Sequence, residues 1–134
     1  MTDREHVSRW LTDYVAAWKS YGRGDIEALF TEDVAYRFHP YDEPVRGRDA
    51  VVAAWLFETD DAAASSRDEP GTYEAEYRPI AVDGEVAVAT GTSTYFSKPG
   101  GPVRTIYENC FVIRFAPDGR CSEFTEYFIE RPPG

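Results

Sequence analysis

The residues of this sequence best suited to chemistry are two glutamates near its carboxyl end, Glu108 and Glu126. Each lies in a run rich in β-branched and aromatic residues, at positions 104–115 and 121–129. Such runs are typical of β-strands, in which side chains alternate between two faces. A carboxyl group that loses its hydration among aromatic rings has a raised pKa, so it can act as a general base or acid near neutral pH.

The two runs flank residues 116–120, where Pro117 and Gly119 suit a tight hairpin turn. The register expected from this turn places Cys110 opposite Glu126. One face of the hairpin would then carry Glu108, Cys110, Phe124, Glu126 and Phe128. The other face would carry Tyr107, Asn109, Phe111, Thr125 and Tyr127. Two glutamates on one face can share a proton and divide the acid and base roles.

Each candidate also has an interpretation without catalysis. Glu126 can be a hydrated carboxylate at a rim, paired with an arginine, and Glu108 can lie with it on a solvated outer face. His39 closes a predicted strand just before Pro40; it is either a proton shuttle or a surface hydrogen-bonding residue. Asn109 can orient a ligand oxygen if its face is the concave one, and otherwise satisfies a dimer contact.

The elements that must position these residues follow from hydrophobic periodicity. Apolar residues at spacings of three and four predict a helix over residues 3–21, and shorter helices are expected at 25–30 and 48–58. A strand is expected at 34–39, a polar loop at 59–71, and strands at 73–82, 86–97, 104–115 and 121–130. Early helices followed by antiparallel strands indicate an α+β fold, with helices on one face of a curved sheet. The uncovered face favours a homodimer.

Composition narrows the class of protein. A chain of 134 residues with 43% hydrophobic content is long enough for one domain, expected to span residues 1–134. A formal charge of −10 and the lack of any Lys/Arg cluster argue against nucleic acid and anionic membranes. No apolar run approaches the roughly 20 residues of a membrane span. A cytoplasmic location is expected, with Cys110 and Cys121 reduced.

Metal and cofactor sites are not expected. The sequence has no His/Cys pair at ligand spacing, no acidic calcium loop and no glycine-rich phosphate loop. Trp18, Trp55, Tyr14 and Tyr36 can stack on an apolar or aromatic ligand, although the same spacing also suits core packing. The expected ligand is therefore a small apolar or aromatic molecule.

The order of these elements and their residues resemble the SnoaL-like group of the nuclear transport factor 2-like superfamily. The resemblance covers nearly the whole chain and rests on Tyr14 with Trp18, and on segments 24–30, 31–36, 45–50 and 118–120. It implies a cystatin-like, cone-shaped antiparallel sheet with three N-terminal helices packed on its concave face. It also implies a pocket between them, lined by Tyr14, Trp18, Phe30, Tyr36, Trp55, Cys110, Phe124 and Phe128.

In SnoaL-like cyclases an acidic residue on the last strand acts as a base, and Glu126 holds about that position. The His partner expected on the preceding strand is missing, because Glu108, Cys110 and Val112 occupy the predicted face. The leading hypothesis is a cofactor-independent isomerase, lyase, cyclase or hydrolase that uses carboxylate acid–base chemistry. Its catalytic residues would be Glu126, Glu108 and His39. The alternatives are a non-catalytic binding or dimerisation module and a ligand carrier.

Overall fold

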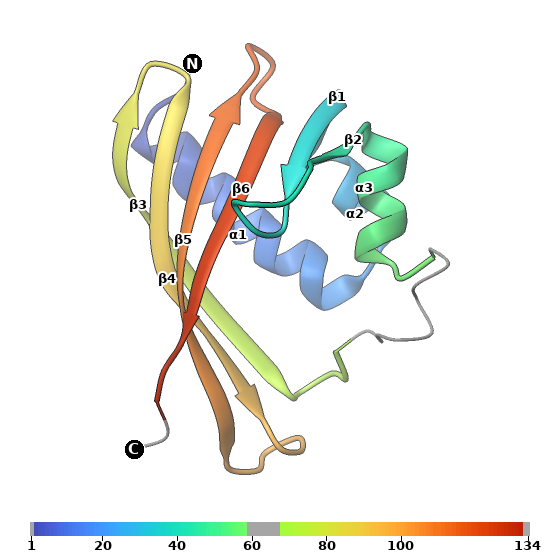
Figure 1. The fold of residues 1–134 in the computed structure, drawn as a ribbon, viewed down its shortest axis with the longest axis vertical. Helices are drawn as coiled ribbons and strands as arrows, with labels where there is room; N and C mark the ends of the chain where they lie inside the picture. Colours follow the sequence, from blue (N-terminus) through green and yellow to red (C-terminus); the bar gives the residue numbers. More distant parts are fainter. Residues whose placement is uncertain (1, 59–67, 133–134) are drawn as a thin grey trace.

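The computed structural model describes residues 2–58 and 68–132 and has the expected α+β architecture (Figure 1). Three helices come early in the chain and six strands form one sheet. The elements are α1 (Arg4–Ser20), α2 (Arg23–Glu27), β1 (Phe30–Arg37), β2 (Val45–Arg46), α3 (Arg48–Trp55), β3 (Tyr73–Asp83), β4 (Val86–Phe96), β5 (Val103–Phe115) and β6 (Cys121–Glu130). The polar loop expected at 59–71 falls largely on residues 59–67, which lie outside the described residues.

The sheet is open and mixed, with strand order β2-β1-β6-β5-β4-β3. Its edge strands, β2 and β3, do not pair with each other. The sheet was expected to be antiparallel, but β1 runs parallel to β6. Parallel neighbours need a long connection, and here α3 and four further strands separate β1 from β6 in the chain. The two-residue strand β2 is too short to produce a periodic pattern, so the sequence did not reveal it.

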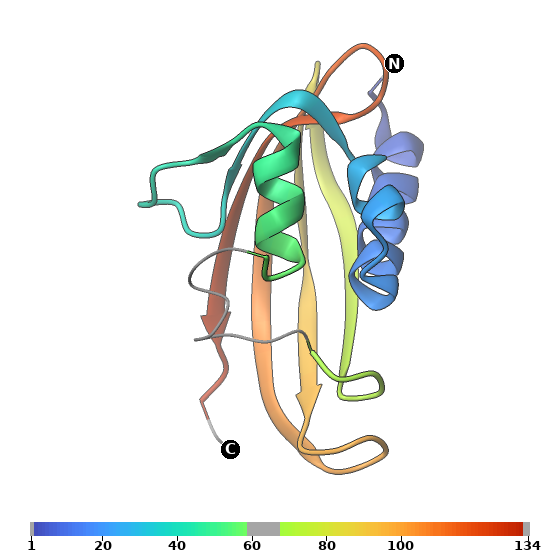
Figure 2. The same cartoon turned by 90° about the vertical axis from the view of Figure 1, so that its right-hand side faces the viewer.

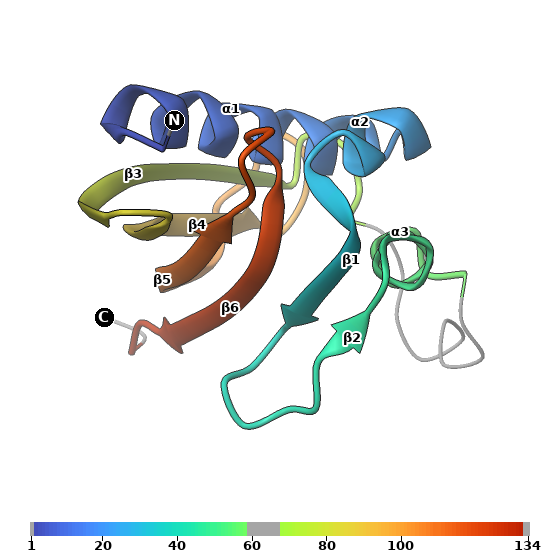
Figure 3. The ribbon, with the colours of Figure 1, turned by 90° about the horizontal axis from the view of Figure 1, so that it is seen from above.

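The helices lie on one face of the sheet. Asp3 caps α1 by accepting a hydrogen bond from the backbone N–H of His6 at 2.8 Å. Seen from above, α1 lies along β3, and α3 lies beside β1 and β2 (Figure 3). The same placement of α1 and α3 is visible from the side (Figure 2). This side of the sheet is called the inner face below, and the uncovered side the outer face.

The register of the β5–β6 hairpin differs by one residue from the expected one. Next to the turn, Phe115 pairs with Cys121 as expected, but Arg114 then pairs with Glu123, so Ser122 is an extra residue. This β-bulge shifts every later pair, and Glu126 lies opposite Phe111. A shift of one residue exchanges the faces of a strand. The prediction that Glu108 and Cys110 share the face of Glu126 was therefore wrong.

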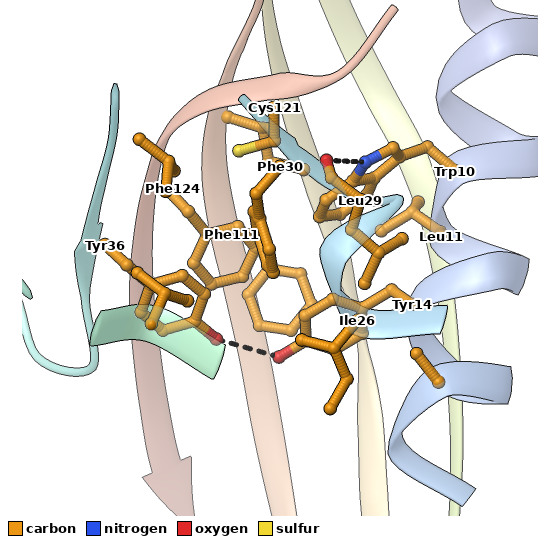
Figure 4. Packing of buried hydrophobic residues seen from close by; sticks show 14 of the residues in the cluster. Trp10, Leu11, Tyr14, Ile26, Leu29, Phe30, Tyr36, Phe111, Cys121 and Phe124 are labelled. Atoms are coloured by element: carbon orange, nitrogen blue, oxygen red, sulfur yellow. Dashed lines mark hydrogen bonds between the residues drawn. The ribbon is translucent and has the colours of Figure 1, made fainter. Parts of the chain in front are cut away.

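Residues of the inner face form the core with the helices (Figure 4). Phe124 stacks on Tyr36 with ring centroids 4.6 Å apart and an interplanar angle of 12°. The indole N–H of Trp10 donates to the carbonyl oxygen of Leu29 at 3.1 Å, which ties α1 to the start of β1. Phe30 and Phe124 are both fully buried in this cluster. The core thus holds β1, β6 and α1 in fixed relation around the site described next.

Two further sequence expectations concern cysteines and membranes. Cys110 and Cys121 are both free thiols, as the sequence predicted. Within residues 2–58 and 68–132, no helix combines the length and apolar character that crossing a membrane requires.

Candidate active site

A cavity of about 570 Å³ opens between the inner face of the sheet and the helices. Its volume lies within the range of roughly 300–1,000 Å³ typical of small-molecule sites. Most of its wall is aromatic, formed by Tyr14, Trp18, Tyr21, Tyr36, Phe38, Trp55, Phe57, Tyr77, Tyr95, Tyr107 and Phe128. The other lining residues are Ala54, Asp68, Ser93, Arg104, Asn109 and Glu126. Such a cavity suits a mostly apolar ligand with a few polar groups.

Glu126 places a carboxyl group in this wall from the middle of β6. Burial raises its pKa from an ordinary value near 4.5 to about 7. The charge of His39 and a hydrogen bond from Asn109 act in the opposite direction and lower it. A carboxyl group with a pKa near 7 is half ionised at neutral pH, so it can both take and return a proton.

A chain of hydrogen bonds, formed by Tyr77, Ser93 and Asn109, crosses the inner face from β3 to β6 and ends at Glu126. It is called the hydrogen-bond chain below. The Asn109 side-chain amide donates to Oε2 of Glu126 at 3.3 Å. The Ser93 hydroxyl donates to Oδ1 of Asn109 at 2.8 Å, and the Tyr77 hydroxyl lies 2.6 Å from Oγ of Ser93. Oε1 of Glu126 has no hydrogen-bond partner among residues 2–58 and 68–132, which leaves that oxygen available to a ligand in the cavity.

A pair of tyrosines forms the second polar feature of the cavity. The hydroxyl groups of Tyr14 on α1 and Tyr36 on β1 lie 3.2 Å apart and are hydrogen bonded (Figure 4). Burial raises the pKa of both well above 10, and the nearby charge of Glu126 raises both further. Both side chains therefore stay protonated. Only one of their two hydrogens is used within the pair, so the other can be donated to a ligand oxygen.

Two charged residues, Asp68 and Arg104, also line the cavity. Oδ2 of Asp68 accepts hydrogen bonds from the Trp18 indole at 3.1 Å and from the Tyr21 hydroxyl at 3.4 Å. The Arg104 guanidinium lies over the ring of Tyr95, 5.6 Å from its centroid. These contacts place one carboxylate and one cation at the wall.

His39 lies beside the site rather than in its wall. Its Nδ1 is 2.8 Å from Oδ2 of Asp42, and its ring centroid is 5.3 Å from that of Phe128. Phe128 does line the cavity. His39 is thus a neighbouring group whose charge influences the pKa of Glu126.

The structure brings together only part of the predicted site. Five predicted ligand-binding residues line the cavity: Tyr14, Trp18, Tyr36, Trp55 and Phe128. Phe30 and Phe124 are core residues behind the wall, and Cys110 lies on the outer face. Glu108 is also on the outer face, where its half-exposed carboxylate pairs with Arg131. Glu108 and Glu126 therefore cannot share a proton.

Sequence reasoning missed Tyr77, Ser93, Tyr95 and Tyr107, and it included Asn109 only on condition that its face was concave. The structure meets that condition, because Asn109 pairs with Phe128 and shares the face of Glu126. A signal was present in the sequence. Ser93 and Asn109 are polar residues at inner positions of strands whose other inner residues are mainly apolar or aromatic, and both are buried.

A metal site is not formed within the part of the chain that the structure describes. No three His, Cys, Asp or Glu side chains gather there in a way that could hold an ion. The polar groups of the cavity are instead a carboxyl group, an amide and several hydroxyls. These groups hold and move protons and bind neutral oxygen atoms.

Comparison with known proteins places the fold in a broad context. The family model of the SnoaL-like domain matches residues 11–124. A candidate ketosteroid isomerase from Kribbella flavida DSM 17836 has a similar structure, with a TM-score of 0.65 and 22% identity over 100% of this chain and 87% of the other. An LEH-like epoxide hydrolase from M. tuberculosis has a TM-score of 0.64 and 18% identity over 96% and 86% of the two chains. No curated protein sequence matches significantly.

Proposed function

The chain belongs to the SnoaL-like domain family, and we propose that it is a cofactor-independent enzyme that moves a proton on a small, mostly apolar carbonyl compound. Glu126 is the base and the Tyr14–Tyr36 pair binds the carbonyl oxygen. One observation carries the proposal: the Glu126 carboxyl group lies in an aromatic cavity with a pKa of about 7. Burial brings the pKa of this carboxyl group close to neutral pH, so the group can be ionised before it takes a proton and protonated afterwards.

The proposed reaction follows from these two polar features. The Glu126 carboxylate takes the proton from the carbon next to the carbonyl group, and the electron pair of that C–H bond moves into an enolate. The negative charge gathers on the enolate oxygen. A tyrosine hydroxyl that donates to this oxygen stabilises the charge, because the donor is already oriented in a site with little water. Where the enolate is conjugated with a C=C bond, Glu126 then returns the proton to the far carbon of the conjugated system, which shifts the double bond and completes an isomerisation.

The tyrosines support this arrangement through their electrostatic coupling to Glu126. The ionised carboxyl group raises the pKa of both Tyr14 and Tyr36, so the three groups are close enough to interact. A tyrosine with such a raised pKa is a hydrogen-bond donor rather than an acid that loses its proton. Glu126 is therefore the group that titrates near neutral pH, and the tyrosines remain neutral donors.

Deuterium exchange into simple ketones tests the proposal and does not require the natural substrate. The protein is incubated in D₂O with 2-tetralone and with 5-androstene-3,17-dione, and deuterium incorporation next to the carbonyl group is followed by NMR. The protein should accelerate exchange, and the rate should rise as the pH increases through about 7. Glu126→Gln should lower the rate by roughly 10²–10⁴-fold, the usual contribution of general base catalysis.

Glu108→Gln is the matched control, because Glu108 comes from the same hairpin but lies on the outer face. It should exchange at the wild-type rate. If NMR shows that a ketone binds in the cavity but exchanges no faster than in buffer, the catalytic proposal fails. The alternative, a non-catalytic ligand-binding protein, then describes the cavity better.

A further inference from the structure

Ser93 and Asn109 are buried polar side chains on an inner sheet face that is otherwise mainly apolar. Ser93 is 4% exposed and Asn109 is 6% exposed. Their neighbours on the inner face of the same strands include Ala89 and Phe111, which are fully or almost fully buried. Burial of a polar side chain costs free energy unless its hydrogen bonds are formed. Two polar residues at these positions therefore call for a specific role.

When Glu126 is ionised, the hydrogen bonds of these residues have a single direction. The Asn109 amide nitrogen donates to Glu126, so its Oδ1 is the atom that faces Ser93 and can only accept. The single hydroxyl hydrogen of Ser93 is used in this bond. At the 2.6 Å contact between Tyr77 and Ser93, the Tyr77 hydroxyl must then be the donor. Each hydrogen bond of the hydrogen-bond chain is thus donated in the direction of the Glu126 carboxyl group.

Tyr77 fits this direction and depends on a glycine. Burial raises the pKa of Tyr77 well above 10, so its hydroxyl keeps the hydrogen that it donates. Tyr77 pairs with Gly91 on β4, and a Cβ at position 91 would lie 2.7 Å from both Cα and Cδ1 of Tyr77. It would also lie 1.9 Å from the carbonyl oxygen of Glu76. Only glycine lets the Tyr77 ring cross β4 here and reach Ser93.

We propose that Tyr77, Ser93 and Asn109 are positioning residues, which hold the Glu126 carboxyl group with Oε2 bound and Oε1 directed to the cavity, and which stabilise its charged form. This role rests on the proposed function of Glu126 as a base. A hydrogen bond that donates to a carboxylate favours the charged form over the neutral one. The hydrogen-bond chain therefore offsets part of the rise in the pKa of Glu126 that burial causes. This keeps a useful fraction of Glu126 ionised near neutral pH.

The other groups that face Glu126 in the described residues do not replace this chain. Tyr14, Tyr36 and Tyr95 come from α1, β1 and β4, and all three remain neutral because burial raises their pKa values. His39, which follows β1, lowers the pKa of Glu126 through its charge when its ring is protonated. Asn109 is the group that donates a hydrogen bond to the carboxyl oxygen. The effect of the chain can therefore be separated from that of the charges.

The test is an NMR titration of Glu126 in protein carrying ¹³C-labelled glutamate, with Glu126→Gln used to assign its signal. Asn109→Leu should raise the pKa by about one unit, the scale of one lost hydrogen bond to a carboxylate. Ser93→Val should raise it by roughly half a unit, because the Asn109 amide is then no longer fixed. Tyr77→Phe, furthest along the chain, should raise it by a few tenths of a unit.

Two matched pairs of variants separate the effect of the hydrogen-bond chain on the pKa of Glu126 from the effect of altered packing. Thr and Val have nearly the same shape, so Ser93→Thr should keep the wild-type pKa of Glu126 while Ser93→Val raises it. Tyr95→Phe removes a hydroxyl from another cavity tyrosine that lies outside the chain, and should leave the pKa unchanged. The proposal is overturned if Ser93→Thr and Ser93→Val titrate alike, or if Tyr95→Phe shifts the pKa as much as Tyr77→Phe.

The titration also separates this inference from the proposed function, because it needs no substrate. A graded shift without any ketone exchange would support the positioning chain and count against the enzyme. Exchange that depends on Glu126 without a graded shift would support the enzyme and reject the chain. If Asn109→Leu does not fold, the two matched pairs still decide the outcome. In an active protein, Ser93→Val should move the midpoint of the pH–rate profile upward, whereas Ser93→Thr should not.

Discussion

Glu126 and Glu108 come from the same hairpin but occupy opposite faces of it. Glu126 lies in the cavity wall with a pKa of about 7. The carboxylate of Glu108 is 50% exposed and pairs with Arg131. Both are glutamates among aromatic and β-branched neighbours in sequence, so residue type does not separate them. The difference shows that the strand register decides which glutamate is buried. Burial, and not residue type, gives Glu126 the raised pKa of a candidate base.

The largest difference between the two faces should appear in stability. Ile113 is fully buried on the inner face of β5, and its neighbour Val112 is 37% exposed on the outer face. Ile113→Ala should lower the free energy of unfolding by about 2–5 kcal/mol, because it leaves a cavity in the core. Val112→Ala should lower it by less than about 1 kcal/mol. Urea unfolding at low protein concentration measures both, and equal losses would contradict the assignment of faces.

The two glutamates should also differ in how they link stability to pH. At low pH, Glu126 is protonated in both the folded and the unfolded protein. Between pH 4.5 and about 7, Glu126 holds its proton in the folded protein but loses it in the unfolded protein. Stability contributed by Glu126 is therefore lost as the pH rises through this window. Glu126→Gln should stabilise the protein by about 2–3 kcal/mol more at pH 8 than at pH 5.

Glu108→Gln provides the comparison for this pH effect. Its exposed ion pair with Arg131 should contribute little at either pH, since solvent screens such pairs. Urea unfolding of the wild type and both variants at the two pH values gives the result. A Glu126→Gln variant whose effect is the same at pH 5 and pH 8 would show that the carboxyl group keeps an ordinary pKa.

The comparison also explains which parts of the site could be predicted from the sequence. The α+β class and the long strands followed from periodicity and turn residues, whereas the inward direction of Glu126 was expected only from the resemblance to SnoaL-like cyclases. The register did not, because a single extra residue, Ser122, exchanges the faces of β5 relative to β6. Nothing in the local sequence marks Ser122 as a bulge. Glu108 and Cys110 were misplaced for this reason, and Asn109 was underestimated.

Long-range contacts limited the prediction of the other polar groups. The Tyr14–Tyr36 contact joins residues from α1 and β1, and the Tyr77–Ser93 contact joins neighbouring strands. Periodicity assigns such residues to a buried face but does not say which hydroxyl groups meet. Gly91 was an overlooked sign, since a glycine within a strand often marks a close approach of another group.

A smaller effect is expected for single hydroxyl groups on the two faces. Tyr36→Phe removes the buried hydrogen bond to Tyr14 and should lower the free energy of unfolding by about 1 kcal/mol. It should also slow ketone exchange by roughly 10²-fold if the pair binds the enolate oxygen. Tyr127→Phe changes an exposed hydroxyl on the outer face and should alter neither quantity. Loss of exchange in Tyr127→Phe would show that the outer face takes part in the reaction.

The smallest effect on the site should come from changes to the outer face, which we propose is the contact surface of a homodimer. No helix of the described residues covers this face, and Val112, Tyr127 and Ile129 are 37%, 44% and 74% exposed there. Apolar residues gathered on an uncovered sheet face favour association. In a twofold dimer the same patch meets itself, so Val112→Arg places two like charges near the axis and should disrupt the contact.

Sedimentation measures this effect, and NMR checks that the site is unchanged. Wild-type protein should sediment at twice the 15.2 kDa mass of the chain and Val112→Arg at that mass, with Glu126 titrating alike in both. Ile80→Arg is the control, because Ile80 is 49% exposed but lies on the edge strand β3. A wild-type monomer would reject the dimer. A changed pKa of Glu126 in Val112→Arg would instead mean that the two faces are coupled, through Thr125, which pairs with Val112 and precedes Glu126 on β6.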